Sequence, residues 1–273
     1  MAFRILANHA HVFPPSVNPD GTIDRLLRLM DACEIEQAVC FAPFSNQLQG
    51  TGIHHNRWLA DAISGNDRLF GFGTLDLTRN DVKAQARQLA DLGLRGIKMH
   101  PNVQEFDILC PAAIEAYAAA QELNLFVTFH SGVHHYRIAH YEVLKFDEVA
   151  YQFPNLHFSL EHVGGYAFFN EALAVITNNI PFPPIPGRGP RVFGGLTSIF
   201  TPNFVRMWYM PPERLLELIA QAGAERLIFG LDFPYNLEDH TRTALQRLKS
   251  VGMSEDQLRL ILGSNLRSVL SIP

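Results

Sequence analysis

One pattern recurs in three segments of the chain: GIKMH at residues 96–100, LFVTFH at 125–130 and LHFSLEH at 156–162. Each segment is a short run of apolar and β-forming residues that ends in a histidine. The three histidines lie 30 and then 32 residues apart, and a helical pattern occupies most of each interval. A strand, a helix and their connections need about 30 residues, so each interval predicts one βα unit. Such alternation is typical of parallel strands joined by crossover helices.

The same alternation extends towards both ends of the chain. We predict strands at residues 3–7, 37–41, 69–75, 96–99, 125–129, 156–161, 192–197 and 227–231. Helical patterns are clearest at residues 23–33, 82–92, 112–123 and 213–222. Thr22 is the expected N-cap of the first of these helices, because its hydroxyl can accept an unpaired first-turn N–H.

Eight such units on 273 residues predict an α/β fold, a somewhat distorted (β/α)₈ or TIM barrel. An open doubly wound sheet is the alternative, and it is weakened because no glycine-rich GxGxxG motif follows the first strand. We expect a single domain over residues 1–273, with one or two helices at residues 254–270 closing the barrel.

Composition excludes several classes of function. The net charge of −5 and the pI near 6.2 leave no basic surface for nucleic acid, and no Lys/Arg cluster suggests a membrane surface. Neither a secretion signal nor a transmembrane stretch is expected. The cysteines Cys33, Cys40 and Cys110 are scattered and odd in number, so they indicate buried thiols rather than disulfides. We therefore expect a cytoplasmic protein that acts on a small molecule.

Histidines and one aspartate mark the predicted strand ends. They are His9 and His11 after the first strand, His100, His130 and His162 after the fourth to sixth, and Asp232 after the eighth. The carboxyl ends of barrel strands converge at one mouth, and residues i and i+2 of a strand share a face. His9, His11, His130 and Asp232 then form an N₃O ligand set, which suits one divalent ion. Zn²⁺ is preferred, with Mn²⁺ or Fe²⁺ also compatible.

The order of motifs resembles that of the amidohydrolase superfamily. These motifs are HAH at residues 9–11, GIKMHP at 96–101, FVTFHSG at 126–132, LEHVGG at 160–165 and FGLDFPY at 229–235. Within the superfamily, the chain is most similar to the group that includes aminocarboxymuconate-semialdehyde decarboxylase. The resemblance implies that His9, His11, His130 and Asp232 bind one metal ion. It also implies that His162 contacts the metal-bound water.

Two positions depart from the family pattern. The family has Asp two residues before the first ligand histidine, where this chain has Ala7, so a carboxylate that orients a ligand is either missing or supplied elsewhere. Lys98 lies in the fourth strand, where binuclear relatives carry a carbamylated lysine that bridges two metals. The mononuclear branch commonly has a lysine there without such a bridge, so a second metal stays an alternative.

Hydrolysis of an ester, lactone or amide is the leading hypothesis, because a divalent ion lowers the pKa of bound water towards 7. We expect Asp232 to take and return the proton, and His162 to orient the water or donate to the oxyanion. Nonoxidative decarboxylation of an unsaturated or aromatic acid is the alternative. A third possibility is a degenerate barrel that binds a ligand without turnover, for which Ala7 is the only support.

Substrate contacts are expected from His100, Lys98 and Arg137. Decarboxylation would need arginines that hold carboxylates, and the candidates near loop ends are Arg57, Arg137, Arg188, Arg191 and Arg206. Aromatic residues near strand ends are more often packing residues, but several at the mouth would favour a planar substrate; they are Phe13, Tyr136, Phe168, Phe169, Phe200, Trp208 and Tyr235. A homodimer is possible by analogy, with apolar residues 204–210 at the interface.

Overall fold

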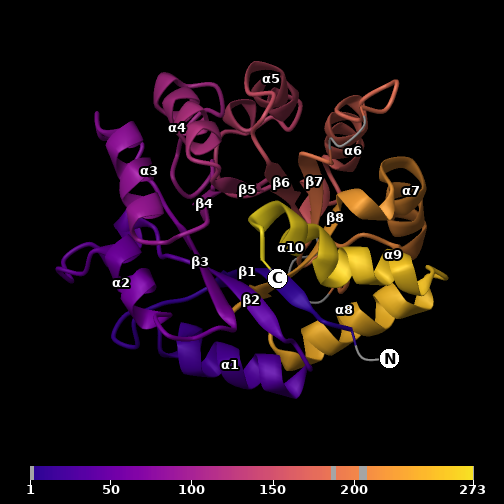
Figure 1. Ribbon diagram of the computed structural model, residues 1–273, viewed down its shortest axis with the longest axis horizontal. Coiled ribbons are helices and arrows are strands. Elements are labelled where there is room, and N and C mark those ends of the chain that lie inside the picture. The colour runs from indigo at the N-terminus through magenta and orange to yellow at the C-terminus, as the bar shows by residue number, and fades with distance from the viewer. Residues whose placement is uncertain (1–2, 186–188, 203–207, 273) are drawn as a thin grey trace.

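The eight predicted strands form a closed parallel barrel in chain order, as a computed structural model shows (Figure 1). The structure describes residues 3–185, 189–202 and 208–272. The strands are β1 Leu6–His11, β2 Gln37–Phe41, β3 Leu69–Gly73, β4 Gly96–Met99, β5 Phe126–His130, β6 Phe158–Glu161, β7 Val192–Leu196 and β8 Leu227–Phe233. The predicted (β/α)₈ barrel is therefore confirmed.

Helices surround the barrel and connect successive strands. They are α1 Ile23–Ala32, α2 His55–Ala62, α3 Val82–Asp91, α4 Pro111–Glu122, α5 Lys145–Gln152, α6 Phe169–Asn178, α7 Pro212–Ala222 and α8 Glu238–Ser250. The hydroxyl of Thr22 accepts a hydrogen bond from the N–H of Arg25 at 3.4 Å, as expected of an N-cap. No helix in the described part of the chain is long and apolar enough to cross a membrane.

Strand β1 differs from its prediction, which ended it at Ala7. Its pairing register with β2 shifts between Ala7 and Ala10, and its register with β8 shifts between Asn8 and Ala10. His9 takes a left-handed φ of +67°. This bulge turns two successive side chains, Asn8 and His9, into the barrel. Ala7 belongs instead to the apolar cluster that includes residues of α1. A bulge of this kind is invisible to a rule of strict alternation.

The barrel interior has two layers. Its N-terminal layer is an apolar cluster of Leu6, Val39, Phe41, Phe72, Phe126, Phe193 and Ile228. Three C-terminal segments, α9 Glu255–Arg259, the π-helical turn Leu260–Ser264 and α10 Asn265–Leu270, lie at this end. Leu266 and Leu270 of α10 join the apolar cluster, which confirms the predicted closing helices. Above it lies a buried polar layer formed by Asn8, Lys98, Thr128, Ser159, Glu161 and Thr197.

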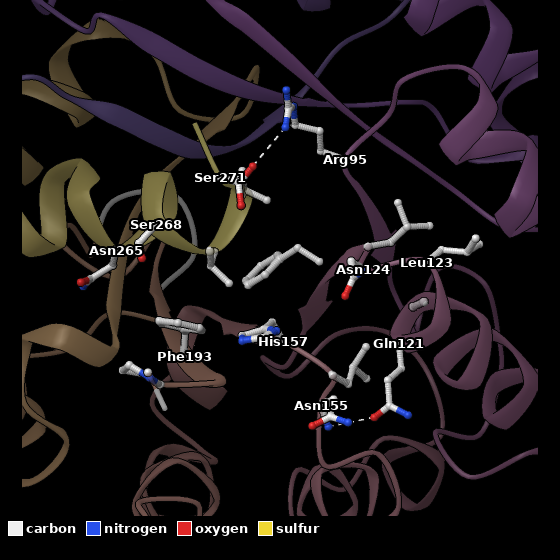
Figure 2. A pocket seen from close by; sticks show the side chains of 18 of the residues that line it. Arg95, Gln121, Leu123, Asn124, Asn155, His157, Phe193, Asn265, Ser268 and Ser271 are labelled. Carbon is white, nitrogen blue, oxygen red and sulfur yellow. Dashed lines mark hydrogen bonds between the residues drawn. The ribbon is translucent and has the colours of Figure 1, made fainter. Parts of the chain in front are cut away.

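A large cavity of about 1100 Å³ opens at the N-terminal end, between α10 and the loops that lead into β4–β7. Figure 2 shows Arg95, Asn124, His157 and Ser268 among the residues that line it. The guanidinium of Arg95 donates to the carbonyl of Leu270 across this space at 3.1 Å. The titratable groups of its described lining are Arg95, His157 and Glu225.

Candidate metal centre

A cavity of about 460 Å³ lies at the C-terminal end of the barrel. Its lining residues come from segments that are far apart in sequence: His9, His11, Phe44, Gln47, His100, Val103, His130, His134, His135, His162, Trp208, Asp232 and Tyr235. The strand ends thus bring together the histidines and the aspartate that the spacing predicted to be neighbours. Most of these polar groups are buried, so their electrostatic interactions are weakly screened.

Three side chains converge closely enough to share one ion. The Nε2 atoms of His9 and His11 are 3.2 Å apart, and Oδ1 of Asp232 lies 3.4 Å and 3.9 Å from them. All three residues are buried, and their ligand atoms lie within 4.8 Å of one another. Imidazole nitrogens and a carboxylate oxygen are ligands suited to Zn²⁺, Mn²⁺ or Fe²⁺. These residues fit a divalent metal.

His130 lines the same cavity but lies outside this converging group. Its Nε2 is 2.9 Å from the carbonyl oxygen of Gly132, and its ring stacks on that of His100 with centroids 3.9 Å apart. Nε2 therefore already has a partner, and ligation through this atom would require the Gly132 contact to break. The role of His130 as a fourth ligand stays a prediction.

His162 is held from two sides. Its Nδ1 donates to the carbonyl of Thr197 at 2.8 Å, and the indole of Trp208 stacks on its ring at 4.1 Å. A neutral imidazole that donates through Nδ1 has a lone pair on Nε2. The ring centroid lies 5.4 Å from that of His9. His162 can therefore offer a hydrogen-bond acceptor beside the converging group.

Backbone strain coincides with these residues. His9, His162 and Asp232 have φ values of +67°, +64° and +62°, in a region that residues other than glycine rarely occupy. Ser198 is also left-handed, at +56°. Such conformations cost free energy and persist where surrounding contacts hold them, which is common at functional sites.

Asp232 is oriented by contacts that the sequence did not reveal. Ser198 donates its hydroxyl to Oδ2 of Asp232 at 2.5 Å, and Nδ2 of Asn236 donates to Ser198 Oγ at 2.7 Å. With Oδ2 engaged in this way, Oδ1 faces His9 and His11. Ser198 lies two residues after the end of β7 and has a left-handed φ, so its contact with Asp232 of β8 could not be read from the strand pattern.

Burial dominates the protonation of the site. It lowers the pKa of His9, His11 and His130 well below the usual range, and the charge of Lys98 adds to this effect. Burial raises the pKa of Asp232 to about 6, against the hydrogen bond from Ser198. The imidazoles are therefore neutral at pH 7, as metal ligands must be.

A sequence profile of the amidohydrolase family matches residues 9–271, nearly the whole described chain and every residue of the converging group. The chain belongs to the amidohydrolase family. The resemblance seen in its motifs is thereby confirmed, and the protein is an enzyme of this superfamily. A search of curated proteins gave no match in sequence.

Several solved structures share the fold of this amidohydrolase. The 5-carboxyvanillate decarboxylase of Sphingomonas paucimobilis superposes with a TM-score of 0.71 at 15% identity, covering 100% of both chains. A dihydroxybenzoic acid decarboxylase of Polaromonas sp. JS666, with bound manganese and the inhibitor 2-nitroresorcinol, gives 0.70 at 16%, covering 99% of this chain and 97% of that one. A candidate 2-pyrone-4,6-dicarboxylic acid hydrolase of Pseudomonas putida gives 0.70 at 20%, covering 99% and 98%. At these identities the likeness shows the fold alone.

The predicted substrate contacts fall in different places in the amidohydrolase. His100 lines the cavity, but Lys98 is completely buried beneath it, with Nζ 3.4 Å from Nε2 of His9. Burial lowers the pKa of Lys98 to about 8. Arg137 is exposed and does not line the cavity. Binding of substrate by Lys98 or Arg137 stays a prediction, as does a second metal.

Two of the other candidate arginines, Arg57 and Arg191, lie in the described part of the chain, and neither lines the cavity. Arg57 is exposed on α2, and Arg191 precedes β7, where it donates to the carbonyl of Ala150 and to Asn179. Arg188 and Arg206 lie outside the described residues. Within residues 3–185, 189–202 and 208–272, neither lysine nor arginine lines the cavity.

The prediction of an exposed apolar interface at residues 204–210 is wrong for the two large apolar residues, Trp208 and Met210, that the structure describes. Residues 204–207 lie outside the described residues. Trp208 and Met210 are buried, not exposed, because Trp208 packs against His162 and donates its indole N–H to the carbonyl of Val133 at 2.9 Å. Trp208 contributes a wall of the cavity instead of an outer surface.

Proposed function

We propose that this amidohydrolase is a metal-dependent hydrolase of a small carbonyl compound, namely an ester, a lactone or an amide of a carboxylic acid. The observation that carries the proposal is the convergence of His9, His11 and Asp232 within one enclosed cavity beside His162. We propose one divalent ion as the cofactor. Zn²⁺ is the preferred ion, while Mn²⁺ is supported by the manganese in the Polaromonas neighbour.

His9, His11 and Asp232 would hold the ion, with His130 as a further ligand. A bound divalent ion supplies Lewis acidity, which lowers the pKa of a coordinated water to about 7. Asp232 would also accept and return a proton as a general base and acid, and burial raises the pKa of its carboxyl above the usual range. His162 accepts a hydrogen bond at Nε2, because its Nδ1 donates to Thr197. Its tautomer thus favours orienting a water over donating to an oxyanion.

The cavity wall favours a small planar substrate. Phe44, Trp208 and Tyr235 contribute aromatic surface around the histidines. Neither lysine nor arginine lines the described cavity, so no cationic side chain there can bind a substrate carboxylate by paired hydrogen bonds. A substrate carbonyl could instead be bound by the metal. This difference favours hydrolysis over decarboxylation.

Nonoxidative decarboxylation is the second candidate function. It is supported by the 5-carboxyvanillate and dihydroxybenzoic acid decarboxylases among the structural neighbours. An aromatic acid would also fit the aromatic walls, with its carboxylate near His100 or His134. Both candidate reactions need the same metal group, so only the products separate them.

The experiment that tests the proposal begins with the metal content of the purified protein. The protein loaded with Zn²⁺ or Mn²⁺ is then incubated with esters, lactones and amides in a pH-stat, and with aromatic and unsaturated carboxylates under CO₂ detection. We expect about one ion per chain and acid release without CO₂. Release of CO₂ would show that the reaction is decarboxylation and not hydrolysis. A metal-loaded protein that turns over neither set of compounds would refute both.

A further inference from the structure

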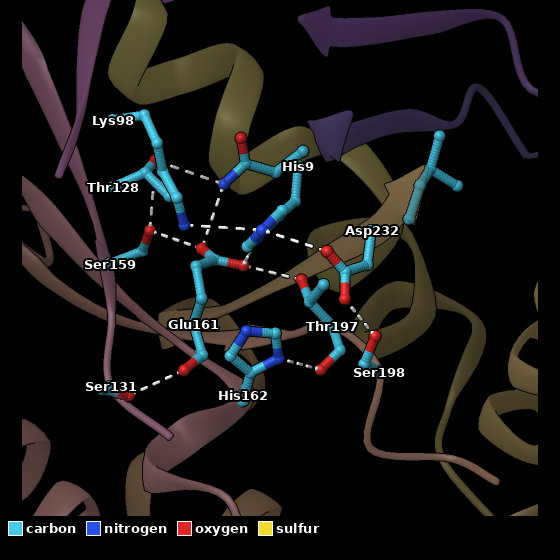
Figure 3. A network of polar contacts seen from close by, with 12 residues as sticks. His9, Lys98, Thr128, Ser131, Ser159, Glu161, His162, Thr197, Ser198 and Asp232 are labelled. Carbon is cyan, nitrogen blue, oxygen red and sulfur yellow. Dashed lines mark hydrogen bonds and ion pairs between the residues drawn. The ribbon is translucent and has the colours of Figure 1, made fainter. Parts of the chain in front are cut away.

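A buried carboxylate lies directly behind the converging group. Glu161, at the end of β6, has no exposed surface. Its Oε1 accepts from Nδ2 of Asn8 at 3.1 Å and from Oγ of Ser159 at 2.6 Å. Its Oε2 accepts from Nδ1 of His9 at 2.9 Å and from Oγ1 of Thr197 at 2.6 Å. Figure 3 shows Ser159, Thr197 and His9 around the carboxylate of Glu161.

The four contacts determine the tautomer and the ring orientation of His9. Each oxygen of Glu161 accepts two hydrogen bonds, so the carboxylate is held in one orientation. The ring of His9 donates through Nδ1 to Oε2, which leaves a lone pair on Nε2. Nε2 is the atom that lies 3.2 Å from His11 and 3.4 Å from Asp232. A carboxylate behind a ligand histidine fixes its tautomer and increases its basicity.

Two glycines leave room for this arrangement. A Cβ atom on Gly195 of β7 would collide with the carboxylate of Glu161, and one on Gly230 of β8 would collide with Oγ1 of Thr197. Neither glycine has a positive φ. These two positions are therefore glycine because a side chain there would collide with Glu161 or Thr197, and not because the backbone conformation requires glycine.

We infer that Glu161 is the positioning residue that orients His9 for metal binding, in place of the aspartate that the family motif has at residue 7. The bulge in β1 explains why residue 7 does not supply the carboxylate, because Ala7 faces the outer apolar cluster while Asn8 and His9 face inward. The inference rests on the proposed metal function. It removes the only support for a degenerate barrel, since the missing carboxylate is supplied from β6.

A rival role for Glu161 is to balance the buried charge of Lys98. The two roles differ in what they require. Charge balance needs only a negative group in the layer, whereas positioning needs the carboxylate at Nδ1 of His9. The substitution Gly195→Ala separates them, because the added methyl displaces the carboxylate without removing its charge.

The test is titration of the metal-free protein with Co²⁺, followed by its visible absorption bands and by the dissociation constant. Loss of a carboxylate behind a ligand typically weakens metal affinity about 10- to 100-fold, and we expect this range for Glu161→Gln with altered Co²⁺ bands. Gly195→Ala should weaken binding in the same direction. The matched control is Thr128→Val, in the same buried layer, which should bind Co²⁺ within about twofold of the unaltered protein.

Thermal unfolding of each metal-free variant, compared with the unaltered protein, reports whether the fold is intact. Equal Co²⁺ affinity in Glu161→Gln and the unaltered protein would overturn the inference, as would equal weakening by Thr128→Val. Weakening by Glu161→Gln with unchanged binding in Gly195→Ala would assign Glu161 to charge balance and overturn it too. If the unaltered protein itself binds no Co²⁺, the proposed metal function fails together with the inference.

Discussion

At the N-terminal end of the barrel the strands point phenylalanine and aliphatic side chains at one another, while at the C-terminal end the same strands point histidine, lysine and carboxylate groups inward. Phe126 and His130 illustrate the contrast, because they lie at opposite ends of β5. Phe126 has ring contacts to Phe72 and Phe193 at about 6 Å. His130 instead has rings of His100 and Trp208 as neighbours.

This contrast shows which end of the barrel stabilises the fold and which end costs it stability. Burial of apolar side chains at the N-terminal end contributes favourably to folding. The C-terminal end buries Lys98 and Glu161 and holds His9 and Asp232 in left-handed conformations within strands. Buried charge and strain both cost free energy. We therefore expect substitutions at one end to change mainly stability, and substitutions at the other to change mainly function.

The largest effect is expected at Asp232, which belongs to the C-terminal end. The substitution Asp232→Asn removes a ligand charge and a proton acceptor while keeping the shape of the side chain. General acid–base groups contribute up to about 10⁴-fold to rate, and we expect a loss of this size in kcat/KM together with weaker metal binding. Steady-state kinetics and metal titration measure it. Activity within tenfold of the unaltered enzyme would show that the converging group is not the reaction site.

Phe126→Ala tests the opposite end. Truncation of a buried phenylalanine typically costs about 3–5 kcal/mol, which for a chain of this size corresponds to a fall in Tm of roughly 10 °C. Because Phe126 lies at the far end of β5 from the cavity, metal affinity should stay unchanged below the unfolding transition. Calorimetry and Co²⁺ titration provide the two readouts. A variant that keeps its Tm but loses metal affinity would contradict the division between the two ends.

The same division explains which features could be predicted from the sequence. Strands β4, β5 and β6 and the positions of His100, His130 and His162 followed from apolar runs at a regular interval. That regularity depends on the barrel repeat, so it places residues at a strand end without fixing the direction of each ring. The contact of His130 with Gly132 could therefore not be predicted from the sequence.

The features that were missed depend on departures from regular geometry. The bulge in β1 moves His9 into the strand and turns Ala7 outward. A rule of strict alternation puts residues i and i+2 on one face, so it cannot reveal that Ala7 and His9 face opposite sides or locate the carboxylate behind His9. One signal was present: Glu161 is a charged residue in a strand whose four residues are all buried. Its partner became evident only when the barrel closed, because β1 and β6 are far apart in the chain.

His162→Ala probes the C-terminal end without removing a member of the converging group. The acceptor at Nε2 is lost, while His9, His11 and Asp232 remain. We expect kcat to fall about 100-fold, in the range of acid–base groups, with metal content unchanged. Turnover by the loaded variant is compared with that of the unaltered enzyme. An unchanged kcat would exclude His162 from the reaction.

Ser198→Ala is expected to have the smallest effect, since it acts on the reaction only through Asp232. The hydroxyl donates to Oδ2 at 2.5 Å, and a hydrogen bond to a charged group contributes about 1.5–3 kcal/mol. Ser198 is only partly buried, so we expect the lower end, a fall of about tenfold in kcat/KM. Ser268→Ala, which alters the lining of the N-terminal cavity, is the matched control and should leave kcat/KM unchanged. Equal effects of the two serine substitutions would show that the carboxylate of Asp232 keeps its orientation without the hydrogen bond from Ser198.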